Sequence, residues 1–248
     1  METIDILYLY PDMLELYGDY GNIQVLKYRI EKRGYKCNII TYTVGDDKPD
    51  FTKYDIVFAG GGADQEQGIL VNDLLSLKDN IKSALESGVF FLLICGAYQL
   101  FGKYYKDASG NIIPGLEIFD YYTIANTDKK KRCIGNIVLD VELNGEKTKV
   151  IGFENHGGQT YDVSRVFGKV LCGNGNKFED SEEGFFDKNI IATYLHGPLL
   201  SKNPRISDYI IKYSLDRKNN KDNILKKLDD GLEEKCRKQL IEQFLNKK

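Results

Sequence analysis

Cys95 and His196 are the side chains whose surroundings in this sequence best suit covalent catalysis. Cys95 follows the uninterrupted apolar run 89–94 and is followed at once by Gly96 and Ala97. Such a run is typical of a strand buried on both faces of a parallel sheet. Small residues after the cysteine permit a sharp strand-to-helix turn, and the amides that open the next helix favour a thiolate. The pattern predicts a nucleophilic cysteine at the C-terminal edge of a sheet.

The chain contains two histidines, which narrows the choice of a general base. His196 comes directly after the apolar run 189–195, so we expect it at the same kind of sheet edge as Cys95. A cysteine and a histidine on neighbouring strand ends can attack an acyl carbon and then protonate the leaving group. His156 falls in the glycine-rich stretch 152–158, which we interpret as a loop. We expect His156 to have a structural role or to form a wall of the substrate site.

Acyl transfer also requires donors for the oxyanion that forms during attack. The backbone amides near Gly62 and at Gly96 are candidates, because glycine lets a carbonyl oxygen approach closely. The alternatives for the run Gly60-Gly61-Gly62 are a plain strand-to-helix turn and a phosphate cradle. The phosphate-binding pattern G-x-x-x-x-G-K-[ST] occurs nowhere in the chain, so we do not expect this chain to use ATP itself.

Strand-like and helical segments alternate along the first hundred residues. Apolar strands are predicted at 4–10, 37–42, 54–59 and 89–94, and helices at 22–34, 69–87 and from Gly96 to Tyr105. This alternation is typical of an α/β fold, a mostly parallel sheet with helices on both faces, whose ligands bind at the C-terminal ends of the strands. Asn144-Gly145, between the apolar segments 138–143 and 147–153, predicts a β-hairpin.

The C-terminal part of the chain is charged and amphipathic. A sparse apolar stripe over residues 223–244 predicts a solvated helix that packs on the domain, the alternative being a helix that docks a partner. We expect one catalytic domain, residues 1–217, with a helical tail, residues 218–248, that belongs to the same unit.

Composition excludes several classes of function. The 34 basic and 37 acidic residues nearly balance, which argues against nucleic acid or an anionic membrane as a partner. The five cysteines are scattered without a C-x-x-C pair, so we expect reduced thiols and no metal site. Neither a signal peptide nor an apolar run long enough to span a bilayer is present, and we expect a cytoplasmic protein.

Several motifs together resemble class I glutamine amidotransferases of the cobyric acid synthase type. They are Cys95-Gly-Ala-Tyr-Gln99, Gly60-Gly-Gly-Ala-Asp64 and Thr193-Tyr-Leu-His196-Gly-Pro-Leu-Leu200. Two more motifs, at 11–22 and 152–156, are similar to the glutaminase subunits of lipid II isoglutaminyl synthases. The resemblance extends from Ile4 to about Tyr213. It implies a flavodoxin-like class I glutaminase domain with a β-hairpin region and a C-terminal helix.

The resemblance also implies a reaction and a set of site residues. In that family a cysteine attacks the carboxamide of glutamine, forms a γ-glutamyl thioester and releases ammonia. Cys95 would then be the nucleophile, His196 the general base and acid, and the amides of Gly62 and Gly96 the oxyanion hole. Gln99 would help to place the substrate. Arg132 corresponds to the arginine that holds the α-carboxylate of glutamine, although it equally suits the end of a solvated basic run.

The implied partner is a separate Mur-ligase-like synthetase subunit, in a heterodimer. That subunit would bind ATP and Mg²⁺, with no cofactor in this chain, and would amidate the α-carboxyl of D-glutamate in the lipid II stem peptide near the inner face of the membrane. Cobyric acid synthases carry their ATP-using domain ahead of the glutaminase, whereas this glutaminase begins at the N-terminus, which favours the cell-wall reaction. The alternatives are a glutaminase for another synthetase, such as a corrinoid amidotransferase, and a stand-alone cysteine hydrolase.

The sequence departs from the family pattern at two positions. Class I glutaminases have a glutamate two residues after the histidine, where this chain has Pro198. The residue that orients His196 is therefore either missing or comes from elsewhere, with Asp19, Glu154 and a residue of the partner as the candidates. Leu93 stands two residues before the nucleophile, where many elbows have glycine, and we expect its larger side chain to alter the turn without abolishing it.

Overall fold

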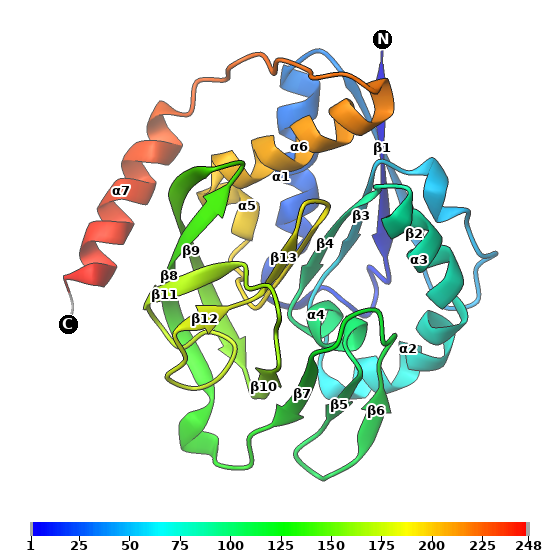
Figure 1. Cartoon of the computed structure of the whole chain (residues 1–248), viewed down its shortest axis with the longest axis vertical. Coiled ribbons are helices and arrows are strands. Elements are labelled where there is room, and N and C mark those ends of the chain that lie inside the picture. The colour runs from blue at the N-terminus through cyan, green and yellow to red at the C-terminus, as the bar shows by residue number, and fades with distance from the viewer. Residues whose placement is uncertain (1, 247–248) are drawn as a thin grey trace.

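The computed structural model describes residues 2–246, and a mostly parallel sheet lies at its centre (Figure 1). Its strands are β1 (Thr3–Leu9), β2 (Lys36–Tyr42), β3 (Ile56–Ala59), β4 (Phe90–Ile94), β13 (Phe185–Asp187) and β14 (Ile190–Thr193). The order across the sheet is β13-β14-β4-β3-β1-β2, and only the edge pair β13–β14 is antiparallel. Every residue of β3 and β4 is buried, as expected for central strands covered on both faces. The predicted α/β sheet is confirmed.

Helices flank this sheet. They are α1 (Tyr20–Lys32), α2 (Asp64–Ser76), α3 (Lys78–Glu86), α4 (Gly96–Phe101), α5 (Leu199–Lys202) and α6 (Pro204–Asn219), with short 3-10 turns η1 (Leu16–Gly18) and η2 (Phe51–Lys53). The prediction of one helix over 69–87 was wrong, because the helix is interrupted at Leu77, between α2 and α3. Leu77 is fully buried and in the helical region of backbone space, so the apolar pattern continues across the break.

The sequence indicated that the first helix begins at Asn22, but this prediction was wrong. It lies inside α1, fully buried, and its side chain joins two distant segments. Its Nδ2 donates to the carbonyl oxygen of Asp19, and its Oδ1 accepts from the amide of Leu200 at 2.9 Å. Asn22 thus ties the start of α1 to the segment that follows His196.

Two smaller sheets lie beside the central one. Their strands are β5 (Tyr104–Lys106), β6 (Ile112–Pro114), β7 (Tyr122–Ala125), β8 (Cys133–Leu143), β9 (Glu146–His156), β10 (Gly158–Tyr161), β11 (Gly168–Cys172) and β12 (Glu182–Glu183), with the 3-10 turn η3 (Lys129–Lys131) before β8. The predicted hairpin is confirmed as β8–β9, because Asn144 and Gly145 both have the positive φ of a tight hairpin turn. The helix predicted to reach Tyr105 ends at Phe101, and Tyr105 lies in β5.

Strand β9 is longer than the sequence indicated and includes most of the stretch interpreted as a loop. His156 is its last residue. Phe153 of β9 and His196, which follows β14, exchange backbone hydrogen bonds of 3.1 and 2.8 Å. A Cβ at Gly152 would lie 2.6 Å from Cγ of Leu195, so only glycine allows this close approach. Gly152, one of the glycines that suggested a loop, therefore lets β9 hold the backbone of His196.

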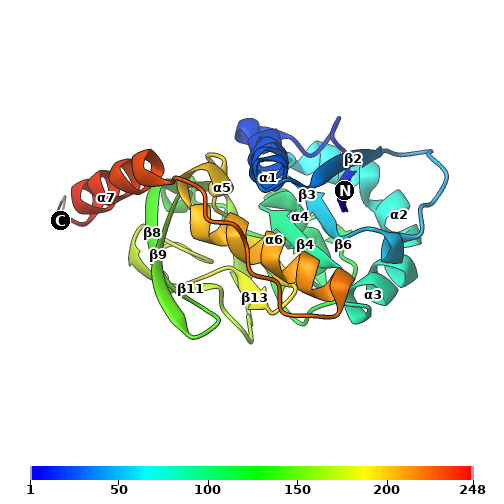
Figure 2. The same cartoon turned by 90° about the horizontal axis from the view of Figure 1, so that it is seen from above.

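The C-terminal helix α7 (Gly231–Leu245) packs outside the β8–β9 hairpin, at the opposite end of the molecule from α2 and α3 (Figure 2). It begins later than the predicted residue 223. Residues 220–230 run along the domain without helical structure. Arg29 on α1 anchors this segment through hydrogen bonds of 2.9 Å to both Asp208 and Asp230. No helix within residues 2–246 is long and apolar enough to cross a membrane.

Candidate active site

Cys95 occupies a strained turn between β4 and α4, as the sequence predicted. Its backbone angles are φ 51° and ψ −102°, a conformation that non-glycine residues rarely adopt. Its amide donates to the carbonyl oxygen of Thr193 at 2.8 Å, which fixes the turn to the end of β14. The residue is 7% exposed. These angles are those of a nucleophile elbow, in which the thiol projects beyond the sheet edge.

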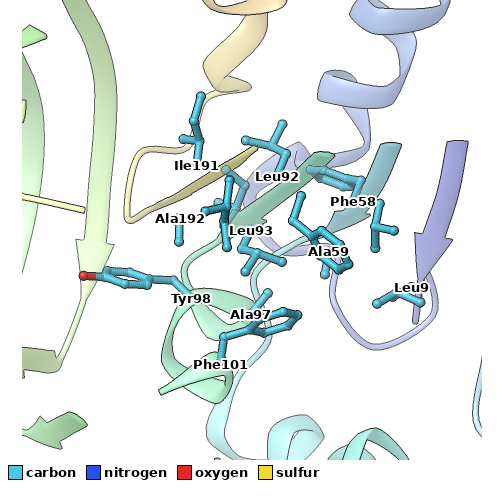
Figure 3. Close-up of a cluster of buried hydrophobic side chains, with 14 of the residues drawn as sticks. Leu9, Phe58, Ala59, Leu92, Leu93, Ala97, Tyr98, Phe101, Ile191 and Ala192 are labelled. Carbon is cyan, nitrogen blue, oxygen red and sulfur yellow. The ribbon is translucent and has the colours of Figure 1, made fainter. Parts of the chain in front are cut away.

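Leu93 does not prevent this turn. It pairs in register with Ala59 on β3 and Ala192 on β14, the two neighbouring strands. Figure 3 shows Leu93 between these alanines in the apolar cluster beneath the elbow. Paired residues of neighbouring strands point to the same face, so the small alanines leave room for the larger side chain. The chain thus accommodates Leu93 through its neighbours in the sheet.

His196 and Asp19 form a fully buried pair. Nδ1 of His196 lies 3.0 Å from Oδ1 and 3.1 Å from Oδ2 of Asp19, and both side chains are 0% exposed. An ionised carboxylate only accepts hydrogen bonds, so Nδ1 carries a proton and Nε2 is left for the reacting groups. Nε2 has no hydrogen-bond partner among the described residues. Glu154, the other residue considered for orienting the histidine, accepts bonds from Asn174 and Gly175 instead.

Gly61 brings the cysteine, the histidine and the aspartate together. Its amide donates to Oδ2 of Asp19 at 2.9 Å, and its carbonyl oxygen accepts from the amide of Leu16. A Cβ on Gly61 would lie 2.9 Å from Cε1 of His196 and 3.3 Å from Cβ of Cys95. The glycine loop after β3 is therefore in van der Waals contact with all three side chains, and a larger residue at Gly61 would displace the imidazole.

The electrostatic environment of His196 favours its charged form. Burial opposes the charge, but the electrostatic interaction with Cys95 and the hydrogen bond to Asp19 outweigh it and raise the pKa of His196 to about 10. His156 shows the opposite behaviour, since burial lowers its pKa to about 3. Of the two histidines, His196 can hold and donate a proton at neutral pH, while His156 stays neutral.

Glutamine hydrolysis should therefore keep its activity well above neutral pH. The raised pKa means that His196 is protonated below about pH 10 and loses its proton, with its ability to protonate a leaving group, as the pH rises through that value. We expect kcat/KM for glutamine to fall on the alkaline side near pH 10, and at lower pH in Asp19→Asn. A pH–rate profile that already falls near the ordinary histidine value of about 6.5 would contradict this environment.

Gly62 and Gly96 lie next to each other, as an oxyanion hole requires. A Cβ on Gly96 would be 2.8 Å from the amide nitrogen of Gly62. Within residues 2–246 neither amide donates to a backbone carbonyl or a side chain. Gln67 on α2 holds the loop in place, because its Nε2 donates to the carbonyl oxygen of Gly62 at 3.1 Å. Two free amides beside the nucleophile can stabilise a developing oxyanion.

Gln99 lines the site, but protein groups occupy both ends of its amide. Its Oε1 accepts from Gln67 at 3.1 Å, and its Nε2 donates to the hydroxyl of Tyr194 at 3.2 Å. Tyr194 stacks on His156 with ring centroids 3.6 Å apart, and Nδ1 of His156 bonds the carbonyl oxygen of Gly158. Gln99 is therefore part of an ordered wall of the cleft, and its amide is already bonded to Gln67 and Tyr194.

A cleft of about 680 Å³ extends from Cys95 to Arg132. Arg132 follows η3, and its Nε donates to Oδ1 of Asn155 on β9 at 3.1 Å. Arg132 lines the cleft, with Nη1 beside Gly157. Lys129 lines the cleft as well, whereas Lys130 and Lys131 do not, and the exposed guanidinium of Arg132 can pair with a carboxylate.

Three residues of this site were not found from the sequence: Tyr17, Gln67 and Asn155. All line or adjoin the cleft, and they come from η1, α2 and β9. One feature of the sequence could have indicated Gln67. It is a polar residue on the same helix face as the buried Leu70, Val71 and Leu74 of α2. In the described part of the chain no cluster of three or more histidine, cysteine or acidic side chains has the arrangement of a metal site.

Comparison with known proteins agrees with this geometry. Residues 5–204 match the family model of the CobB/CobQ-like glutamine amidotransferase domain. A solved crystal structure of a glutamine amidotransferase has a TM-score of 0.55 with this chain, covering 84% of this chain and 98% of the other. Their sequences are 15% identical, so this likeness concerns the fold.

Two curated relatives match over most of their length. The GatD subunit of the glutamine-hydrolysing lipid II isoglutaminyl synthase of Staphylococcus aureus is 40% identical, over 88% of this chain and 87% of that protein. The corresponding GatD subunit of Streptococcus pneumoniae is 38% identical, over 92% of this chain and 87% of that protein. The chain therefore belongs to the CobB/CobQ-like glutamine amidotransferases, a family in which its relatives include these GatD subunits.

Proposed function

We propose that this chain is the glutaminase subunit of a lipid II isoglutaminyl synthase. It hydrolyses glutamine through a thioester on Cys95 and supplies ammonia to a synthetase. The main support is a single cleft that Cys95 and Arg132 both line, with the His196–Asp19 pair packed beside Cys95 at Gly61. Glutamine has matching ends, since its carboxamide suits the nucleophile and its α-carboxylate suits a guanidinium.

The first step forms a thioester and releases ammonia. The Cys95 thiolate attacks the side-chain carbonyl carbon of glutamine, and the oxyanion that forms is stabilised by the amides of Gly62 and Gly96. His196, protonated and held by Asp19, donates its Nε2 proton to the departing nitrogen. The carbon–nitrogen bond breaks, ammonia leaves, and a γ-glutamyl thioester remains on Cys95.

The second step restores the enzyme. Neutral His196 takes a proton from water, and the resulting hydroxide attacks the thioester carbon within the same oxyanion hole. The carbon–sulfur bond breaks, glutamate leaves, and the Cys95 thiolate is regenerated beside protonated His196. One glutamine and one water thus yield one glutamate and one ammonia, and this chain requires no cofactor for either step.

The ammonia passes to a Mur-ligase-like partner subunit in a cytoplasmic heterodimer. That partner binds ATP and Mg²⁺ and amidates the α-carboxyl of D-glutamate in the lipid II stem peptide, a step of peptidoglycan synthesis. The support for this assignment is the similarity to two GatD subunits over 87% of their length. Lipid II is reached through the partner at the inner face of the membrane.

The decisive test is ammonia release from glutamine by this chain, first alone and then with the candidate synthetase, ATP, Mg²⁺ and lipid II. We expect glutamine hydrolysis coupled to amidation of lipid II. Hydrolysis without amidation would reject the cell-wall assignment in favour of another synthetase, such as a corrinoid amidotransferase. No hydrolysis under either condition would reject the glutaminase and favour a stand-alone cysteine hydrolase.

Arg132→Ala should weaken the use of glutamine mainly through KM. The guanidinium contacts the α-carboxylate in both the ground state and the transition state, so its loss removes uniform binding. A hydrogen bond to a charged group contributes about 1.5–3 kcal/mol, which predicts a KM increase of roughly 10- to 100-fold with kcat little changed. Steady-state glutaminase kinetics measure this split.

Lys130→Ala is the matched control for Arg132, because Lys130 is an exposed residue of the same basic run and does not line the cleft. We expect wild-type kinetics from it. Equal kinetics in Arg132→Ala and Lys130→Ala would show that Arg132 does not bind glutamine and is only the last residue of a solvated basic run.

A further inference from the structure

Tyr17 lines the cleft and links two parts of the site, because its ring contacts His196 and its hydroxyl shares Asn155 with Arg132. It is the central residue of η1 and has the left-handed angles φ 56° and ψ 26°, which are unfavourable for a bulky side chain. Gly61 fixes the turn on both sides of Tyr17, through the amide of Leu16 and the carboxylate of Asp19. Strain that is held so firmly is typical of functional sites.

The ring of Tyr17 covers the catalytic histidine. It meets the imidazole of His196 edge-on, with ring centroids 4.9 Å apart and an angle of 69° between the planes. Tyr17 nevertheless remains 47% exposed, so one side of the residue faces solvent while the other faces the site. Tyr17 is therefore in reach of a ligand in the cleft.

The hydrogen bonds of Asn155 show that the hydroxyl of Tyr17 is an acceptor in its bond to this residue. Arg132 Nε can only donate, so the Asn155 atom 3.1 Å away from it is the amide oxygen. The amide nitrogen of Asn155 then donates to the hydroxyl oxygen of Tyr17 at 2.7 Å. The hydroxyl proton of Tyr17 has no acceptor among residues 2–246, and it is free to donate to a ligand in the cleft.

We propose that Tyr17 is a substrate-positioning residue that recognises the α-carboxylate of glutamine together with Arg132. This inference rests on the proposed function. The carboxylate accepts from the Nη groups of Arg132 and from the hydroxyl of Tyr17, while Asn155 holds both donors at a fixed spacing. Carboxylate oxygens have enough lone pairs for both donors, and such charge-assisted bonds are strong. The site would select amino acids with a free α-carboxylate.

The test compares glutamine with its α-methyl ester, which lacks the carboxylate charge, as substrates of the full chain with the synthetase subunit present. Tyr17→Phe removes the hydroxyl and keeps the ring against His196. We expect kcat/KM for glutamine to fall roughly tenfold or more, with the value for the ester unchanged. The preference for glutamine over the ester therefore falls by the same factor.

Tyr20→Phe is the matched control, since Tyr20 stacks on Tyr8 and does not line the cleft. It should keep the wild-type preference. An unchanged preference in Tyr17→Phe, or an equal loss for both substrates, would overturn the role of Tyr17 while the glutaminase assignment stands. A wild-type complex that releases no ammonia from glutamine would reject the proposed function, and this inference with it.

Discussion

Cys95→Ala is expected to abolish glutamine hydrolysis and leave the fold intact. The thiol is the only nucleophile that the structure places against His196 and the free amides of Gly62 and Gly96 within residues 2–246. Removal of a catalytic nucleophile typically lowers kcat by roughly 10⁴-fold or more. The side chain is small and lies at the sheet edge, so its truncation leaves the core beneath the elbow unchanged. Ammonia release and thermal unfolding, measured on the same preparation, check both parts of this expectation.

Cys236→Ala provides the control for the loss of a thiol. Cys236 is an exposed free cysteine on α7, at the opposite side of the β8–β9 hairpin from the site. We expect wild-type ammonia release from this variant. Substantial glutaminase activity in Cys95→Ala would exclude Cys95 as the nucleophile.

Asp19→Asn is expected to produce the second largest loss. The carboxylate of Asp19 holds the proton of His196 on Nδ1, which leaves Nε2 for the reacting groups, and it stabilises the imidazolium. An asparagine keeps the size of the side chain but can present its amide to Nδ1 and favour the wrong tautomer. In catalytic triads this change lowers kcat by up to about 10⁴-fold. Because Asp19 makes no side-chain cap to α1, the effect should fall on kcat and not on the stability of that helix.

Glu154→Gln distinguishes Asp19 from the other acidic residue considered for this role. Glu154 is fully buried, but it accepts hydrogen bonds from the loop at Asn174 and Gly175 and does not contact His196. We expect Glu154→Gln to keep most of its glutaminase activity. If Asp19→Asn is as active as the wild type in the assembled complex, the orienting group belongs to the partner and the triad described here is wrong.

The elbow could be predicted from the sequence because its determinants are local. An apolar run, a cysteine and two small residues specify a buried strand, a sharp turn and the start of a helix within a few positions. The same holds for the hairpin, where Asn144 and Gly145 both need positive φ. The placement of Cys95 and His196 at one sheet edge followed from the direction of parallel strands.

The remaining site residues depend on contacts that no local pattern encodes. Asp19 meets His196 across 177 positions of sequence, and Tyr17 meets Asn155 across 138. The glycines at 152–158 suggested a loop, whereas Gly152 lies within β9 and its missing side chain makes room for Leu195, which follows a distant strand. Arg132 was ambiguous for the same reason, since its hydrogen bond to Asn155 and its place in the wall of the cleft exist only in the folded chain.

The proposed mechanism requires a covalent intermediate on Cys95 during the hydrolysis of glutamine. The most direct measurement is acid quenching of the complex during turnover, followed by mass spectrometry of the peptides that contain cysteine. We expect one γ-glutamyl group on the peptide that contains Cys95 and none on the peptides of the other cysteines. Ammonia release at the normal rate without any glutamyl group on Cys95 would contradict the mechanism.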